Sequence, residues 1–128
     1  MNIHYKVYLY MKWIVEFDDK FEQEFWKFSS NVQVEIASKA KLLEDFGHGL
    51  GRPNADTLEG SKHSNMKELR LKADNGVWRV AYAFDPERKA ILLVAGDKAG
   101  ISQKRFYKKL ISKADERFSA HLSRLGGK

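Results

Sequence analysis

The stretch from Met66 to Lys98, MKELRLKADNGVWRVAYAFDPERKAILLVAGDK, decides the fold. It holds three segments with strand-like patterns, separated by two groups of turn-forming residues, Asp74-Asn75-Gly76 and Asp85-Pro86-Glu87-Arg88. Aspartate, asparagine, glycine and proline favour the backbone angles of tight turns. The stretch therefore predicts a meander of three antiparallel strands.

Alternation within these strands separates an apolar row of side chains from a row that carries arginines. Arg70 alternates with Leu69 and Leu71, and Arg79 shares a row with two small alanines. Because successive side chains of a strand point to opposite faces, we expect Arg70 and Arg79 to lie in a shallow groove on the face away from the core. The core-facing row of the second strand is Trp78, Val80, Tyr82 and Phe84. The continuous apolar run 91–95 predicts a third strand that is covered on both faces.

The segments around the meander predict one further strand and three helices. Residues 3–17 alternate between apolar and polar positions, as a half-buried strand does. Apolar residues at helical spacing predict a helical hairpin, with one helix after a cap at residues 18–19 and the next running from a cap near Ser29 to Gly47. A last helix should follow Ser102, and residues 47–65 should form a loop.

These elements give the order β-α-α-β-β-β-α, which is an α+β layout. We expect the N-terminal strand to lie alongside the meander, with the helices packed on one face of the sheet. The other face would then stay open and hold the arginines.

Composition limits the classes of function. The chain has 128 residues, which is the size of one domain, and a formal net charge of +6, which favours an anionic partner. It has no cysteine and its four histidines lack zinc-site spacing, so we expect neither disulfides nor a metal site. No apolar run is long enough to span a membrane and no signal peptide is apparent, so a cytoplasmic protein without a membrane partner is expected.

The order of four motifs resembles a known family. These motifs are KELR (67–70), VWRVAY (77–82), an apolar strand that runs into GDK (96–98), and a basic helix with KKLISKADER (108–117). Together they resemble the RelE/ParE superfamily of bacterial type II toxins, and within it the HigB-like, phage-derived branch. The resemblance implies a RelE-like fold, with a small antiparallel sheet, an N-terminal helical hairpin and a C-terminal helix.

The likeness covers about residues 11–125, so residues 1–128 are expected to form a single toxin domain. Residues 1–10 fall outside it. They are either a native extension of the first strand or lie upstream of an alternative start at Met11.

The resemblance also implies an activity. It implies an endoribonuclease that cleaves mRNA on the ribosome, with a small helix-turn-helix antitoxin as its partner. No metal or other cofactor is implied, because in this family the ribose 2′-hydroxyl attacks the adjacent phosphate while basic residues stabilise the developing charge.

Carried over by position, the resemblance implies that Arg70 and Arg79 hold the scissile phosphate, to which the planar guanidinium is well matched. Lys98 would add charge, and Tyr107 would stack on a base or assist proton transfer. His63 is a candidate acid or base, because histidine exchanges protons near neutral pH. The candidate RNA-binding residues are Lys67, Lys104, Arg105 and Lys108. Some relatives have a lysine where Glu68 stands, and the general base is left unassigned.

Two alternatives remain open. The chain could act as a ParE-like toxin that inhibits gyrase without being an enzyme, or as a non-toxic basic module that binds RNA or protein. Fold does not choose between these functions, but the cations around Arg70, Arg79 and Lys98 favour RNA cleavage. The structural alternative for Arg70 is an ordinary ion pair with a neighbouring acid such as Glu68.

Overall fold

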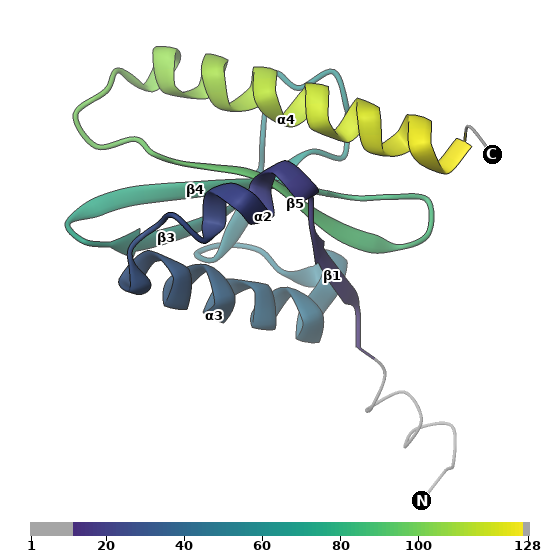
Figure 1. The fold of residues 1–128 in the computed structure, drawn as a ribbon, viewed down its shortest axis with the longest axis horizontal. Coiled ribbons are helices and arrows are strands. Elements are labelled where there is room, and N and C mark those ends of the chain that lie inside the picture. Colours follow the sequence, from purple (N-terminus) through teal and green to yellow (C-terminus); the bar gives the residue numbers. More distant parts are fainter. Residues whose placement is uncertain (1–11, 127–128) are drawn as a thin grey trace, which may run out of the picture.

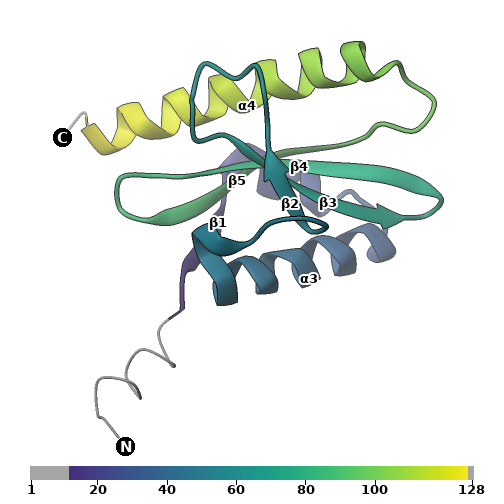
Figure 2. The same ribbon diagram turned by 180° about the vertical axis from the view of Figure 1, so that it is seen from behind.

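The protein forms a five-stranded sheet with helices on both sides, as Figures 1 and 2 show for a computed structural model that describes residues 12–126. The strands are β1 (Ile14–Phe17), β2 (Ala55–Thr57), β3 (Lys67–Ala73), β4 (Gly76–Phe84) and β5 (Lys89–Asp97). The helices are α2 (Asp19–Phe25), α3 (Ser30–Phe46) and α4 (Gln103–Gly126), with a short 3₁₀ turn at Gly47–Gly49. The expected strand over residues 3–17 is confirmed for Ile14–Phe17, and residues 3–11 lie outside the described part.

The meander is confirmed, because β3 pairs antiparallel with β4 and β4 pairs antiparallel with β5. The strand order across the sheet is β1-β5-β4-β3-β2. β1 runs parallel to β5, so the sheet is mixed rather than purely antiparallel. A tight turn forces antiparallel pairing, but β1 and β5 are separated in the chain by two helices and three strands, so β5 can run in the same direction as β1.

The segment expected to be a loop contains a strand. β2 pairs with residues 67–69 of β3 and forms the edge of the sheet. Only three residues make this strand, which is too short for alternation to reveal it in the sequence. Its effect is to bring residues 52–57 beside β3.

The sheet has an apolar core on each face. On one face, the predicted apolar row of β4 packs with Leu69, Leu71 and residues of α2 and α3. On the other face, Ala81 and Ala83 pack with Phe106, Leu110 and Phe118 of α4. The expectation that all helices lie on one face is therefore wrong, and Figure 1 shows α4 and α3 on opposite sides of the sheet.

The small alanines explain this difference. Instead of leaving a groove, Ala81 and Ala83 make room for α4, whose apolar stripe needs a surface to cover it. The approach is close, since a Cβ atom on Gly96 would lie 3.0 Å from the Phe106 ring. β5 is covered on both faces, as predicted, because Leu92 belongs to one core and Leu93 to the other.

The predicted caps are confirmed. Asp18 accepts from the backbone of Lys20 and Phe21, and Ser29 accepts from the backbone of Val32. Gly47 ends α3 with a φ of +53°. Ser102 accepts from the backbone N–H of Arg105 in the first turn of α4. None of the helices within residues 12–126 is both long and apolar enough to cross a membrane.

Candidate functional site

A groove lies on the α4 side of the sheet, beside the N-terminal end of α4. It consists of two cavities, of about 570 Å³ and 310 Å³, and both are lined by Arg52 and Arg70. We call it the cationic groove, after the six basic side chains that line it: Arg52, Arg70, Lys72, Arg79, Lys98 and Lys104. The expected open face is thus confined to the part of the sheet that α4 does not cover.

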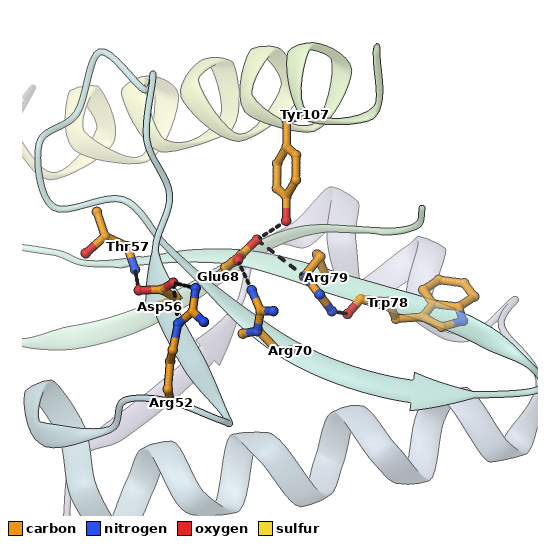
Figure 3. A network of polar contacts seen from close by, with 8 residues as sticks. All are labelled: Arg52, Asp56, Thr57, Glu68, Arg70, Trp78, Arg79 and Tyr107. Carbon is orange, nitrogen blue, oxygen red and sulfur yellow. Dashed lines mark hydrogen bonds and ion pairs between the residues drawn. The ribbon is translucent and has the colours of Figure 1, made fainter. Parts of the chain in front are cut away.

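Glu68 lies at the centre of the groove and contacts side chains from three elements (Figure 3). Its Oε2 accepts from Nη1 of Arg70 at 2.8 Å, and its Oε1 accepts from the Tyr107 hydroxyl at 2.8 Å. Nε of Arg79 lies 3.8 Å from the same Oε1. β3, β4 and α4 therefore meet at one carboxylate.

Arg79 is more deeply buried than Arg70. The side chain of Arg79 is 6% exposed and that of Arg70 is 26% exposed. Nη1 of Arg79 donates to the backbone carbonyl of Trp78 at 3.0 Å, whereas its Nε has no hydrogen-bond partner within residues 12–126. Arg70 is thus the arginine of this pair that solvent reaches, with Arg79 behind it.

Burial and charge shift the pKa values of two groups in the groove. Burial lowers the pKa of Lys98, and the positive charges of Arg79 and Arg70 lower it further. Burial raises the pKa of Tyr107, as does its hydrogen bond to Glu68. The two side chains are neighbours, with Nζ of Lys98 5.9 Å from the centre of the Tyr107 ring. Tyr107 therefore stays protonated at neutral pH and donates to the carboxylate.

A second acid–arginine pair lies at the rim of the groove. Asp56 on β2 accepts from Nε and Nη2 of Arg52 at 2.9 and 2.7 Å, and also from the backbone N–H of Thr57. Asp56 stands directly opposite Glu68 in the pairing of β2 with β3. Sequence reasoning missed Arg52, and its position in a glycine- and proline-containing segment carried no signal that it would reach β3.

The structure brings five of the predicted residues to the groove and leaves the others elsewhere. Arg70, Arg79, Lys98, Tyr107 and Lys104 line it or contact its network. Lys67 lies in the row of Leu69, on the α3 side of the sheet. Arg105 lines a different cavity together with Lys109 and Lys113, and Lys108 is exposed on α4.

His63 lies away from the groove. Its Nε2 is 2.9 Å from Oγ of Ser119, and its ring packs edge-on against Phe118. Ser119 is about 18 Å along the helix from Tyr107, at a rise of ~1.5 Å per residue. The loop that carries His63 therefore contacts the middle of α4 rather than its beginning.

Comparisons with known proteins agree on one family. The family model described as "Phage derived protein Gp49-like (DUF891)" matches residues 23–119. In Mycobacterium tuberculosis, "Putative toxin HigB2" is 46% identical over 89 residues, which are 69% of this chain and 44% of that protein. "Putative toxin HigB3" of the same organism is 43% identical over 96 residues, which are 75% of this chain and 82% of that protein. The match thus spans less than half of the first relative and most of the second.

Two solved structures share the fold. A mutant of E. coli toxin RelE in the free state has a TM-score of 0.60 at 18% identity, covering 84% of this chain and 98% of the other. The archaeal RelE-RelB complex from Pyrococcus horikoshii OT3 includes a chain with a TM-score of 0.50 at 16% identity, covering 70% of this chain and 99% of the other. The chain therefore belongs to the Gp49-like family of phage-derived proteins, is homologous to the HigB proteins of M. tuberculosis, and has a RelE-like α+β fold.

Proposed function

We propose that this protein is the toxin of a type II toxin–antitoxin pair and that it cleaves mRNA on the ribosome. Its two relatives, which are described as putative HigB toxins, support the toxin assignment. The observation that carries the cleavage assignment is the meeting of Arg70, Arg79, Lys98 and Tyr107 around one groove. A helix-turn-helix antitoxin would be its partner, and both would act in the cytoplasm.

The proposed reaction transfers a phosphoryl group within the RNA. The 2′-oxygen of the ribose forms a bond to the adjacent phosphorus, and the bond from phosphorus to the 5′-oxygen breaks. The proton of the 2′-hydroxyl leaves during the attack, and the 5′-oxygen gains a proton as it departs. The groove contributes by holding the phosphate and stabilising the negative charge that builds on it.

Each basic residue has a distinct place in this proposal. Arg70, whose side chain is part-exposed, would contact the phosphate oxygens with its planar guanidinium. Arg79 would add positive charge from beneath, and Lys98 from the end of β5. Tyr107 would stack on a nucleobase of the RNA or lie near the departing 5′-oxygen. These roles need the side chains to be in place before the RNA arrives.

Mapping of mRNA ends after induction tests the proposal. The chain is expressed under tight control, and mRNA ends are sequenced from translating ribosomes. We expect cuts in phase with codons, and we expect Arg70→Ala and Arg79→Ala to reduce them strongly. Arg124→Ala, which removes an exposed arginine near the end of α4, serves as the matched control and should leave the cuts unchanged.

Two results would contradict the proposal. Growth arrest with DNA damage and intact mRNA would favour a toxin that inhibits gyrase. Normal growth with intact mRNA, from a chain shown to be folded, would favour a non-toxic binding module. Because Arg79 is buried, circular dichroism of each variant shows whether a lost cut reflects a lost side chain or a lost fold.

A further inference from the structure

Glu68 is the most central of three acids, with Asp56 and Glu59, in a groove that six basic side chains line (Figure 3). Its side chain is 5% exposed. A carboxylate weakens the attraction of this groove for phosphate, because like charges repel. The proposed reaction assigns no role to Glu68, but its contacts with other residues of the groove indicate one.

Those contacts link the residues that the proposed reaction uses. Glu68 holds Arg70 and Tyr107 through hydrogen bonds of 2.8 Å, one on each carboxylate oxygen. Its Oε1 also faces Nε of Arg79, a buried donor without another partner within residues 12–126. Arg70, Arg79 and Tyr107 come from three different elements, so no single strand or helix sets their relative positions.

The surroundings of Glu68 show that it is held firmly. On β4 it faces Ala81, which is buried in the core beneath α4. On β2 it faces Asp56, and two acids opposite each other destabilise a sheet. Arg52 neutralises Asp56 while Arg70 neutralises Glu68. Each of the two opposed acids therefore has its own arginine partner.

We infer that Glu68 is a positioning residue, which holds Arg70, Arg79 and Tyr107 in one arrangement and thereby sets the rate of cleavage. The inference rests on the proposed function, because it describes how the same groove is organised. Glu68 acts through its three neighbours and need not touch the RNA. It should therefore affect the rate of the bound complex more than the binding of RNA.

Glu68→Gln tests this inference, because it keeps the size of the side chain and removes the charge. Cleavage of mRNA on purified ribosomes is measured as a function of toxin concentration and pH. We expect the maximal rate to fall about 10- to 100-fold, as misplaced groups cause, while the half-saturating concentration does not rise. The alkaline side of the pH–rate profile should move to lower pH, because the negative charge of Glu68 raises the pKa of both Lys98 and Tyr107.

A spectroscopic measurement on the free protein follows the positioning directly. The Nε–H signal of Arg79 is recorded by nuclear magnetic resonance and assigned with Arg79→Lys. The Tyr107 hydroxyl is titrated by ultraviolet absorbance, as the difference from Tyr107→Phe. In Glu68→Gln, the Arg79 signal should shift and the Tyr107 hydroxyl should titrate at lower pH. Glu87→Gln removes the same charge from an exposed turn and should change none of these readouts.

A second variant keeps the test valid if Glu68→Gln is poorly folded. Tyr107→Phe removes the hydroxyl that links Glu68 to α4. It should slow cleavage, and an unchanged rate in folded Tyr107→Phe would overturn the inference. Where both single variants fold, the double variant should be slower by less than the product of the two single effects. Multiplicative effects would overturn the inference.

Three further outcomes overturn it. The first is an unchanged maximal rate in Glu68→Gln. The second is a slower rate with unchanged Arg79 and Tyr107 signals, which would mean that Glu68 acts on the RNA itself. If the wild-type chain does not cleave mRNA, the proposed function fails separately. In that case the inference is tested by the spectroscopic measurements on the free protein. Unchanged Arg79 and Tyr107 signals in Glu68→Gln would overturn the positioning role.

Discussion

Lys98 is a lysine of the groove whose pKa is lowered by its surroundings. It follows β5 directly, and its backbone N–H donates to the carbonyl of Val77 at 2.8 Å. Burial and the nearby arginines Arg79 and Arg70 lower its pKa. An anionic phosphate in the groove would oppose this effect. The residue is therefore sensitive to whether the groove is filled.

Lys98→Arg should change the pH dependence of cleavage. Because the pKa of Lys98 is lowered, its positive charge is lost at a lower pH than that of an ordinary lysine. Cleavage at low toxin concentration should therefore decline on the alkaline side, and Lys98→Arg should move this decline to higher pH, since arginine stays protonated. Lys109→Arg, outside the groove, is the control. Identical alkaline declines in the wild type and Lys98→Arg would contradict the expectation.

At the scale of elements, local sequence decides where helices end and long-range contacts decide where they pack. Gly47 ends α3 with a positive φ and lies against the ring of Trp13. α4 is held by contacts along its length, among them Arg117 with Glu24 on α2 and His121 with the buried Asp85. These contacts hold the C-terminal half of α4, while Phe106 packs in the core beside Tyr107, which reaches Glu68.

Gly47→Ala should destabilise the protein strongly. A Cβ atom there would lie 2.1 Å from the Trp13 ring, and the φ of +53° is unfavourable for alanine. We expect the free energy of unfolding, measured by urea denaturation, to fall by about 2–4 kcal/mol from strain and overpacking together. Gly49→Ala is the matched control, because a Cβ atom at that position meets nothing within 4 Å. Equal losses in the two variants would refute this account of Gly47.

Glu24→Gln should weaken the link between α2 and α4 in a pH-dependent way. The hydrogen bond from Arg117 holds the pKa of Glu24 below its usual value. A folded-state pKa below the unfolded one stabilises the fold above the unfolded pKa, and this stability is lost as pH falls through the folded pKa.

The free energy of unfolding of Glu24→Gln should be about 1–2 kcal/mol lower than that of the wild type at neutral pH. This value allows for screening by solvent, because the side chain of Glu24 is 36% exposed. The difference from the wild type should shrink in acid. Denaturation curves at several pH values measure it, with Glu87→Gln as control. A loss that does not depend on pH would mean that the charge of Glu24 is not responsible.

At the scale of the whole molecule, the sheet has an apolar core on each face, and the groove lies where the second core ends. α3 and α2 cover one face, and α4 covers part of the other. The remaining part holds the cationic groove, and Arg52, on the connection before β2, lines it beside Asp56 (Figure 3). The formal net charge of +6 adds a general attraction for RNA around this groove.

Arg52→Ala should lower the salt dependence of RNA binding. Each phosphate contact that is lost reduces the slope of log K against log salt by about 0.7–1. Binding of a 2′-O-methyl RNA, which cannot be cleaved, is measured at several salt concentrations. Lys41→Ala, which removes an exposed cation from α3, should leave the slope unchanged. Equal slopes for the wild type and Arg52→Ala would show that Arg52 contacts no phosphate.

Much of the fold could be predicted because its signals are local. The turns at residues 74–76 and 85–88, the caps at Asp18, Ser29 and Ser102, and the period-two rows of the meander each depend on neighbouring residues. The same alternation predicts that Arg70 and Arg79 share one face of the sheet. The prediction that this whole face is open was wrong, because alternation shows which face a residue has but not what covers it.

The sequence by itself determined the three helices, the meander and the placement of Arg70 and Arg79 on one face, since alternation, capping and turn chemistry act over a few residues. Tertiary structure alone decided that β1 runs parallel to β5, that α4 covers Ala81 and Ala83, and that His63 lies far from Tyr107. It also decided that Arg52 and Glu68 line the same cavity. These outcomes depend on contacts between segments that are far apart in the sequence, and a pattern over a few residues does not predict such contacts.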